Sequence, residues 1–98
     1  MNMISRKEAE MIEKGKIKAV IREENIKEKR FCINNSVYKV KKKVRWTMAR
    51  CVAQRKTDFG KTVKEAIETI KYLYGYYEPD KVVYLIVLEK DKKQEVLG

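Results

Sequence analysis

Residues 82–88 read VVYLIVL, and this is the longest apolar stretch of the chain. Four of its seven residues are β-branched, which favours a strand. The stretch carries no charge, so we expect both faces of the strand to be buried, either at the centre of a sheet or in the last strand of a closed barrel. This strand is the element around which the other predicted elements are arranged.

A helix is predicted just before this strand. Thr62-Val63-Lys64-Glu65 has the sequence of a capping box, in which the first and fourth residues bind each other's backbone amides. Gly75 can adopt the left-handed conformation that ends many helices. We expect the apolar stripe between them to pack against residues 82–88. That stripe consists of Val63, Ala66, Ile67, Ile70, Leu73 and Tyr74, which recur at helical spacing.

The beginning of the chain predicts another helix that leads into a strand. Ser5-Arg6-Lys7-Glu8 is a second capping box, and Gly15 follows as the end of the helix. Residues 16–22 then alternate between apolar and mostly basic residues, which is typical of a strand with one buried and one basic face. At the turn before this strand, backbone amides and lysines can converge on an anion. An ordinary turn with a solvated basic face is the alternative.

The middle of the chain predicts three strands. Residues 31–40 contain two short strands around a turn at 34–36, where asparagine tolerates a positive φ. The lysines at 41–43 either extend the second strand or form a loop. Residues 44–54 predict a long strand. One side of it carries Val44, Trp46, Met48 and Val52.

This order of elements predicts an α+β fold: a small mixed β-barrel with two flanking helices. A chain of 98 residues has room for one core. We therefore expect a single domain over residues 1–90. Residues 91–98 are polar and predict a flexible tail.

Positive charge is concentrated in the first part of the sequence. Residues 1–56 hold 17 of the 24 Lys and Arg and only 6 of the 14 Asp and Glu, so their net charge is +11, whereas the rest carries −1. A basic face of this kind attracts polyanions, and nucleic acid is the leading candidate. The alternative is a surface laced with ion pairs, as in an archaeal or thermophilic protein. That alternative explains the 39% of charged residues but not the excess of one sign.

Several kinds of chemistry find no support in the sequence. It has no histidine, which is the commonest general base, and no acidic or cysteine spacing that suits a metal. We therefore expect no metal and no cofactor. Cys32 and Cys51 are expected to be free, buried thiols. No apolar stretch is long enough to cross a bilayer and no signal segment is present, so we expect no membrane partner and a cytoplasmic protein.

Residues 15–22, GKIKAVIR, resemble the Gly-x-Lys-x-x-Glu-x-Arg signature of the ASCH family, a group of PUA-like β-barrels. Gly15 and Arg22 stand at the first and last positions of that signature. Ile17 and Val20 stand where the family has its lysine and glutamate.

Lys16 and Lys18 flank the missing lysine and can replace its charge. The order of elements is also similar to that of the family over residues 4–90. The resemblance implies a PUA-like barrel that binds RNA. Some ASCH and PUA-like domains resemble nucleases that need no metal, and others read modified bases.

A basic cleft between residues 15–22 and 39–46 is the predicted site for RNA or another single-stranded nucleic acid. Cations would contact phosphates, and an aromatic ring would stack on a base. The candidate residues are Lys16, Lys18, Arg22, Tyr38, Lys41, Lys43, Arg45 and Trp46. Two alternatives stay open. One is a metal-independent ribonuclease on the same fold with lysine and tyrosine as acid and base; the other is a module whose basic face binds an acidic protein.

Overall fold

The computed structural model describes residues 4–91, so all but the first residue of the polar tail predicted at 91–98 lies outside the described residues. The predicted α+β class is confirmed. The elements are α1 (Arg6–Glu13), β1 (Ala19–Arg22), β2 (Arg30–Ile33), β3 (Ser36–Thr47), α2 (Met48–Arg55), the 3-10 turn η1 (Lys56–Asp58), α3 (Val63–Tyr74) and β4 (Val82–Lys90). Three α-helices are therefore present in the described chain, where the sequence predicted two.

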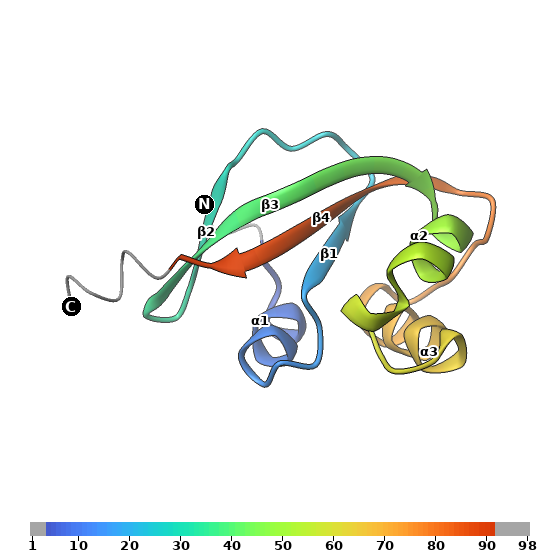
Figure 1. The fold of residues 1–98 in the computed structure, drawn as a ribbon, viewed down its shortest axis with the longest axis horizontal. Helices are drawn as coiled ribbons and strands as arrows, with labels where there is room; N and C mark the ends of the chain where they lie inside the picture. The colour runs from blue at the N-terminus through green and yellow to red at the C-terminus, as the bar shows by residue number, and fades with distance from the viewer. Residues whose placement is uncertain (1–3, 92–98) are drawn as a thin grey trace.

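The four strands form one antiparallel sheet in the order β1-β4-β3-β2. The sheet curls into half a barrel, and β3 and β4 arch over the helices (Figure 1). β4 lies between β1 and β3, and five of its residues from Val83 to Leu88 are buried. The prediction of a central strand with two buried faces is thus confirmed.

Most of the predicted helix caps and turns are confirmed. Ser5 and Glu8 form both hydrogen bonds of the capping box at the start of α1. Gly75 ends α3 with a φ of 85°, and Asn34 in the β2–β3 turn has a φ of 54°. At the start of α3 the capping box is incomplete, because the Glu65 carboxylate accepts from the amide of Lys61.

The lysine run 41–43 continues β3. Val40 pairs with Leu88 and Lys42 pairs with Val87, which leaves Lys41 as the extra residue of a β-bulge. A bulge bends its strand and changes the direction of a side chain. This irregularity places Lys41 at the site described below.

The predicted strand over 44–54 is correct as far as Thr47 and wrong beyond it. β3 ends at Thr47, whose side chain accepts a hydrogen bond from the amide of Arg50 and so begins α2. Met48, Cys51 and Val52 are buried, at the spacing of one helical face. The residues after Thr47 include good helix formers, and this propensity favours a helix once the hydroxyl has capped it.

Burial in β1 and α3 also differs from the predicted patterns. Val20 is as fully buried as Ala19, so β1 has no basic face. In α3 the fully buried residues are Ala66 and Ile70, whereas Val63 at the start of the predicted stripe is 45% exposed. The core of this part of the molecule therefore lies nearer the middle of α3 than the sequence suggested.

Candidate functional site

The turn between α1 and β1 does not hold free backbone amides. The amide of Gly15 donates to Ile12, and those of Lys16 and Ile17 donate to Met11. The next amide, that of Lys18, donates to the carbonyl oxygen of Asp58 at 2.9 Å. The turn can therefore attract an anion through its lysine side chains but not through its backbone.

Two hollows meet beside this turn. The first, of about 470 Å³, lies where β4 ends and is lined by Lys18, Tyr38 and Lys41 among others; we call it the Lys41 hollow. The second, of about 570 Å³, lies between the same turn and α3 and is lined by Lys16, Lys18 and Lys61 among others; we call it the Lys61 hollow. Both volumes are in the range of small-molecule sites. The two hollows share Gly15, Lys18 and Thr57, so they adjoin each other, and we refer to both together as the cleft.

The cleft contains cations that other side chains do not neutralise. Within residues 4–91, Lys16, Lys18, Lys41 and Lys61 form no ion pair. Arg55 also lines the Lys41 hollow, but it is paired with Asp58 at 2.7 Å. Acidic residues line the hollows as well: Glu89 lines the Lys41 hollow, and Glu65 and Glu68 line the Lys61 hollow. The four unpaired lysines and the ring of Tyr38 are groups that contact phosphates and bases in nucleic-acid sites.

The structure brings together half of the eight predicted site residues. Lys16, Lys18, Tyr38 and Lys41 line the cleft. Arg22, Lys43, Arg45 and Trp46 line neither hollow. The predicted cleft between residues 15–22 and 39–46 is therefore confined to the end of the sheet where β1 begins.

Two of the four outlying residues, Lys43 and Arg45, lie on β3 away from the cleft. The Lys43 ammonium group donates to Asn25 at 2.6 Å and to the carbonyl oxygen of Ile26 at 3.0 Å. Arg45 lies opposite Tyr84 in the register, four residues beyond Lys41 along β3, which is about 13 Å in an extended strand.

Trp46 is half-buried near the far end of β3. The guanidinium of Arg50 lies 4.7 Å from the centre of its ring, and the ammonium of Lys42 lies 5.8 Å away. A base that stacked on this ring would compete with these cation–π contacts. Two aromatic residues line the cleft, Tyr38 and Phe59, and Phe59 is only 1% exposed, so Tyr38 is the one whose ring is accessible.

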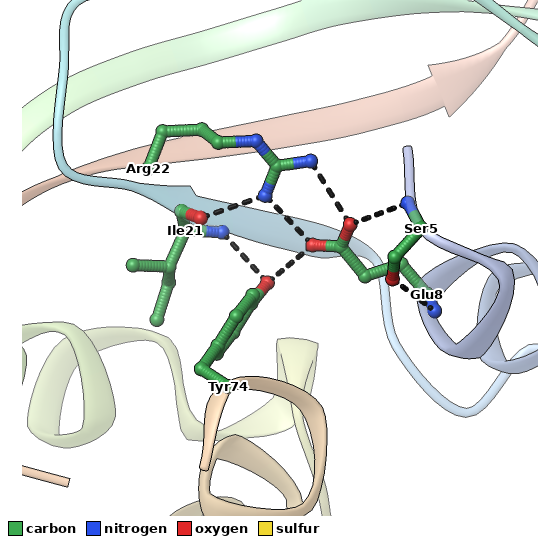
Figure 2. Close-up of polar contacts among 5 residues, drawn as sticks. All are labelled: Ser5, Glu8, Ile21, Arg22 and Tyr74. Carbon is green, nitrogen blue, oxygen red and sulfur yellow. Dashed lines mark hydrogen bonds and ion pairs between the residues drawn. The ribbon is translucent and has the colours of Figure 1, made fainter. Parts of the chain in front are cut away.

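Arg22 belongs to a buried polar cluster with Glu8 and Tyr74 (Figure 2). Its guanidinium donates to both carboxylate oxygens of Glu8, at 2.8 and 2.9 Å, and to the carbonyl oxygen of Ile21 at 2.7 Å. The Tyr74 hydroxyl donates to Glu8 at 2.5 Å and accepts from the amide of Ile21 at 2.9 Å. The side chains of Tyr74 in α3 and of Arg22 in β1 itself therefore satisfy both backbone polar groups of Ile21 on the edge strand β1.

The pKa values of the cluster reflect burial and hydrogen bonding together. Burial by itself would raise the pKa of Glu8, but hydrogen bonds from Arg22, Tyr74 and Ser5 and the charge of Arg22 bring it below its ordinary value of 4.5. Burial, followed by the charge of Glu8, raises the pKa of Tyr74 well above its ordinary value of 10. A carboxylate and a neutral phenol locked in this way stabilise an edge strand. Glu8 is almost fully buried, whereas Arg22 and Tyr74 line a third hollow of about 270 Å³.

The sequence identified Glu8 only as a capping residue and did not identify Lys61 or Arg55 as site residues. Lys61 follows Gly60 in the loop before α3, and only the fold brings that loop to the turn at Gly15. Arg55 lies in the last turn of α2, next to η1. The sequence did not predict this helix, and so it did not predict the position of Arg55. Contacts between such distant segments leave no local signal.

The chain matches no protein-family model, and comparison with curated proteins and with solved structures finds no match either. Within residues 4–91, no group of histidine, cysteine and acidic residues is placed to hold a metal ion. The helices of this same range are all too short or too polar to cross a membrane. The chemistry of the cleft therefore decides which function the chain supports.

Proposed function

We propose that this protein binds single-stranded RNA along the cleft formed by the Lys41 and Lys61 hollows. The observation that carries this proposal is the set of four unpaired lysines that line two adjoining hollows. Lys16, Lys18 and Lys41 contact phosphates, and Tyr38 stacks on a base. The excess positive charge of residues 1–56 speeds the capture of the polyanion.

We propose further that the fold is a PUA-like barrel of the ASCH kind. The curled, antiparallel, four-stranded sheet supports this relationship (Figure 1). So does the position of GKIKAVIR, which runs from the end of α1 through β1 as the signature requires. In that comparison Arg22 is a structural residue, because it is bonded to Glu8 beneath the edge strand.

Binding is better supported than cleavage. A metal-independent ribonuclease needs an accessible acid and base with pKa values suited to proton transfer. Glu8 is almost fully buried and Tyr74 is hydrogen-bonded to it, with the pKa of the carboxyl lowered and that of the phenol raised, so the pair is poorly suited to exchange protons with RNA. In this proposal the lysines and the tyrosine of the cleft hold RNA in position.

The test is fluorescence anisotropy with a labelled single-stranded RNA of about a dozen nucleotides, in EDTA, at rising salt concentration. Each phosphate contact contributes about −0.7 to the slope of log K against log salt. Three lysine contacts therefore give a slope of about −2. Lys18→Glu and Lys41→Glu should weaken binding and flatten this slope.

Arg45→Glu and Lys64→Glu are the matched controls, because each makes the same change of charge outside both hollows. They should reduce affinity much less than Lys18→Glu. Equal effects from all four variants would show that only overall charge matters, and an absence of binding at low salt would overturn the proposal. In that second outcome the basic surface is better assigned to an acidic protein partner, and loss of intact RNA in EDTA would instead indicate the ribonuclease.

A further inference from the structure

One cationic residue, Lys18, is shared by the two hollows. Lys18 lines both of them, and its side chain is exposed. Its backbone is held from two sides, because its amide donates to Asp58 in η1 and its carbonyl oxygen accepts from Leu88 in β4, each at 2.9 Å. The ammonium group of Lys18 thus extends from a rigid point on the boundary between the hollows.

The surface at Gly15, which both hollows share, carries no side chain. A Cβ atom built on Gly15 would meet no atom of the described residues within 4 Å, and its φ of 72° disfavours any larger residue there. No side chain at position 15 therefore stands between a ligand and Lys18.

We infer that the cleft recognises a two-nucleotide step, with one nucleoside in each hollow and the joining phosphodiester on Lys18. This inference rests on the proposed function and adds the size and register of its ligand. In the Lys41 hollow, the ring of Tyr38 offers a stacking surface. In the Lys61 hollow, Met11 offers an apolar contact and Thr69 offers a hydroxyl.

The inference predicts that a dinucleotide binds more tightly than a mononucleotide. If charge alone decided affinity, the mononucleotide would bind more tightly, so the two cases can be told apart. A mononucleotide such as uridine monophosphate carries a phosphate monoester of nearly two charges at neutral pH, whereas the diester of the dinucleotide UpU carries one. A surface that only attracts anions would therefore bind the mononucleotide better. A site that joins two hollows gains from linking two nucleosides, because the second binding event becomes intramolecular.

The experiment is calorimetric titration of the full chain with uridine monophosphate, UpU and UpUpU, each also with Lys18→Gln. We expect UpU to bind at least about tenfold more tightly than the mononucleotide, and UpUpU to lie within about threefold of UpU. Lys18→Gln should reduce the advantage of UpU to less than about threefold. Lys16→Gln, which removes a lysine that lines only the Lys61 hollow, should keep most of that advantage.

Failure of this inference can be told from failure of the proposed function. If the longer RNA binds but affinity rises evenly with each nucleotide, or if Lys18→Gln leaves the advantage of UpU intact, the two-nucleotide register is wrong and the RNA-binding function stands. If the longer RNA does not bind either, both are wrong. A circular dichroism spectrum of each variant serves as the control for retention of the fold.

Discussion

Arg22 and Glu8 form a two-pronged ion pair between the edge strand β1 and the helix α1. The two N–O distances are 2.8 and 2.9 Å, and Glu8 is only 1% exposed. Water cannot take the place of either partner without opening the molecule. The pair therefore couples the position of α1 to the integrity of β1.

Glu8→Gln should destabilise the protein strongly. Removing one member of a buried ion pair leaves the other charge without compensation and costs about 3–5 kcal/mol. Urea unfolding followed by circular dichroism measures this loss. Glu10→Gln, an exposed position on the same helix, is the control and should change the free energy of unfolding by less than about 0.5 kcal/mol.

Stability should fall in acid partly because of Glu8. Its pKa in the folded protein lies below the ordinary value of 4.5, so below that pH the unfolded chain binds a proton more readily than the folded one. The contribution of Glu8 is therefore complete above pH 4.5 and is lost as the pH falls through the folded pKa. A plot of unfolding free energy against pH should be less steep below this value for Glu8→Gln than for the unmodified chain, and equal slopes would contradict the assignment.

Tyr74→Phe should leave the amide of Ile21 without its acceptor. A buried donor that loses its partner costs about 1–3 kcal/mol. Because the pKa of Tyr74 is raised, the unfolded chain releases this proton first and stability should decline above pH 10, a decline that the variant should show less. Tyr72→Phe, at a ring that is 52% exposed, should have neither effect when unfolding is measured at neutral and alkaline pH.

The two thiols should react at very different rates. Cys32 is exposed in β2, whereas Cys51 is buried in α2, and burial raises the pKa of its thiol to about 11. Both are free, as the sequence predicted, but the expectation that both are buried is wrong for Cys32. A thiol reagent should label one cysteine in the native protein and two after unfolding, with mass spectrometry to locate the label. Equal native rates would contradict this environment for Cys51.

Replacing side chains of α3 by alanine should distinguish its buried residues from its exposed ones by the loss of stability. Ile70→Ala removes a fully buried side chain and should cost about 2–5 kcal/mol in the free energy of unfolding. Val63→Ala, on the same helix, removes a half-exposed one and should cost less than about 0.5 kcal/mol. Thermal or urea unfolding compares the two, and similar losses would show that the first turn of α3 is also part of the core.

The features that were predicted correctly are those determined by residues close together in the sequence. The capping box at Ser5 and the left-handed glycine at Gly75 are decided within one helical turn, and both are present. The buried strand at 82–88 follows from composition alone, because an uncharged, β-branched stretch is stable only when covered on both faces.

The strand predicted over 44–54 failed because two periodicities coincide there. Met48 and Val52 are four residues apart, a spacing that suits one face of a strand and one face of a helix equally. Cys51 distinguishes the two, since it is buried with them at the i+3 position of the helix. Thr47 was the available signal, as a helix-capping residue before good helix formers.

The site was only partly predictable, because its residues come from distant segments. Lysine density indicated Lys16, Lys18 and Lys41, which the fold does bring to one cleft. The same density also indicated Arg22, whose bond to Glu8 crosses 14 residues and is set by the packing of α1. Charge along a sequence marks a surface, and only tertiary contacts decide which cations remain accessible.

Because β1 pairs with β4, the start of the chain cannot complete its folding until the end of the described chain is present. Ala19 pairs with Val87, and Glu8 is bonded to Tyr74, so the first helix and strand depend on residues made much later. Such long-range contacts slow folding because a long loop must close before they form. We therefore expect β1 to take its place in the sheet only after β4 has been synthesised.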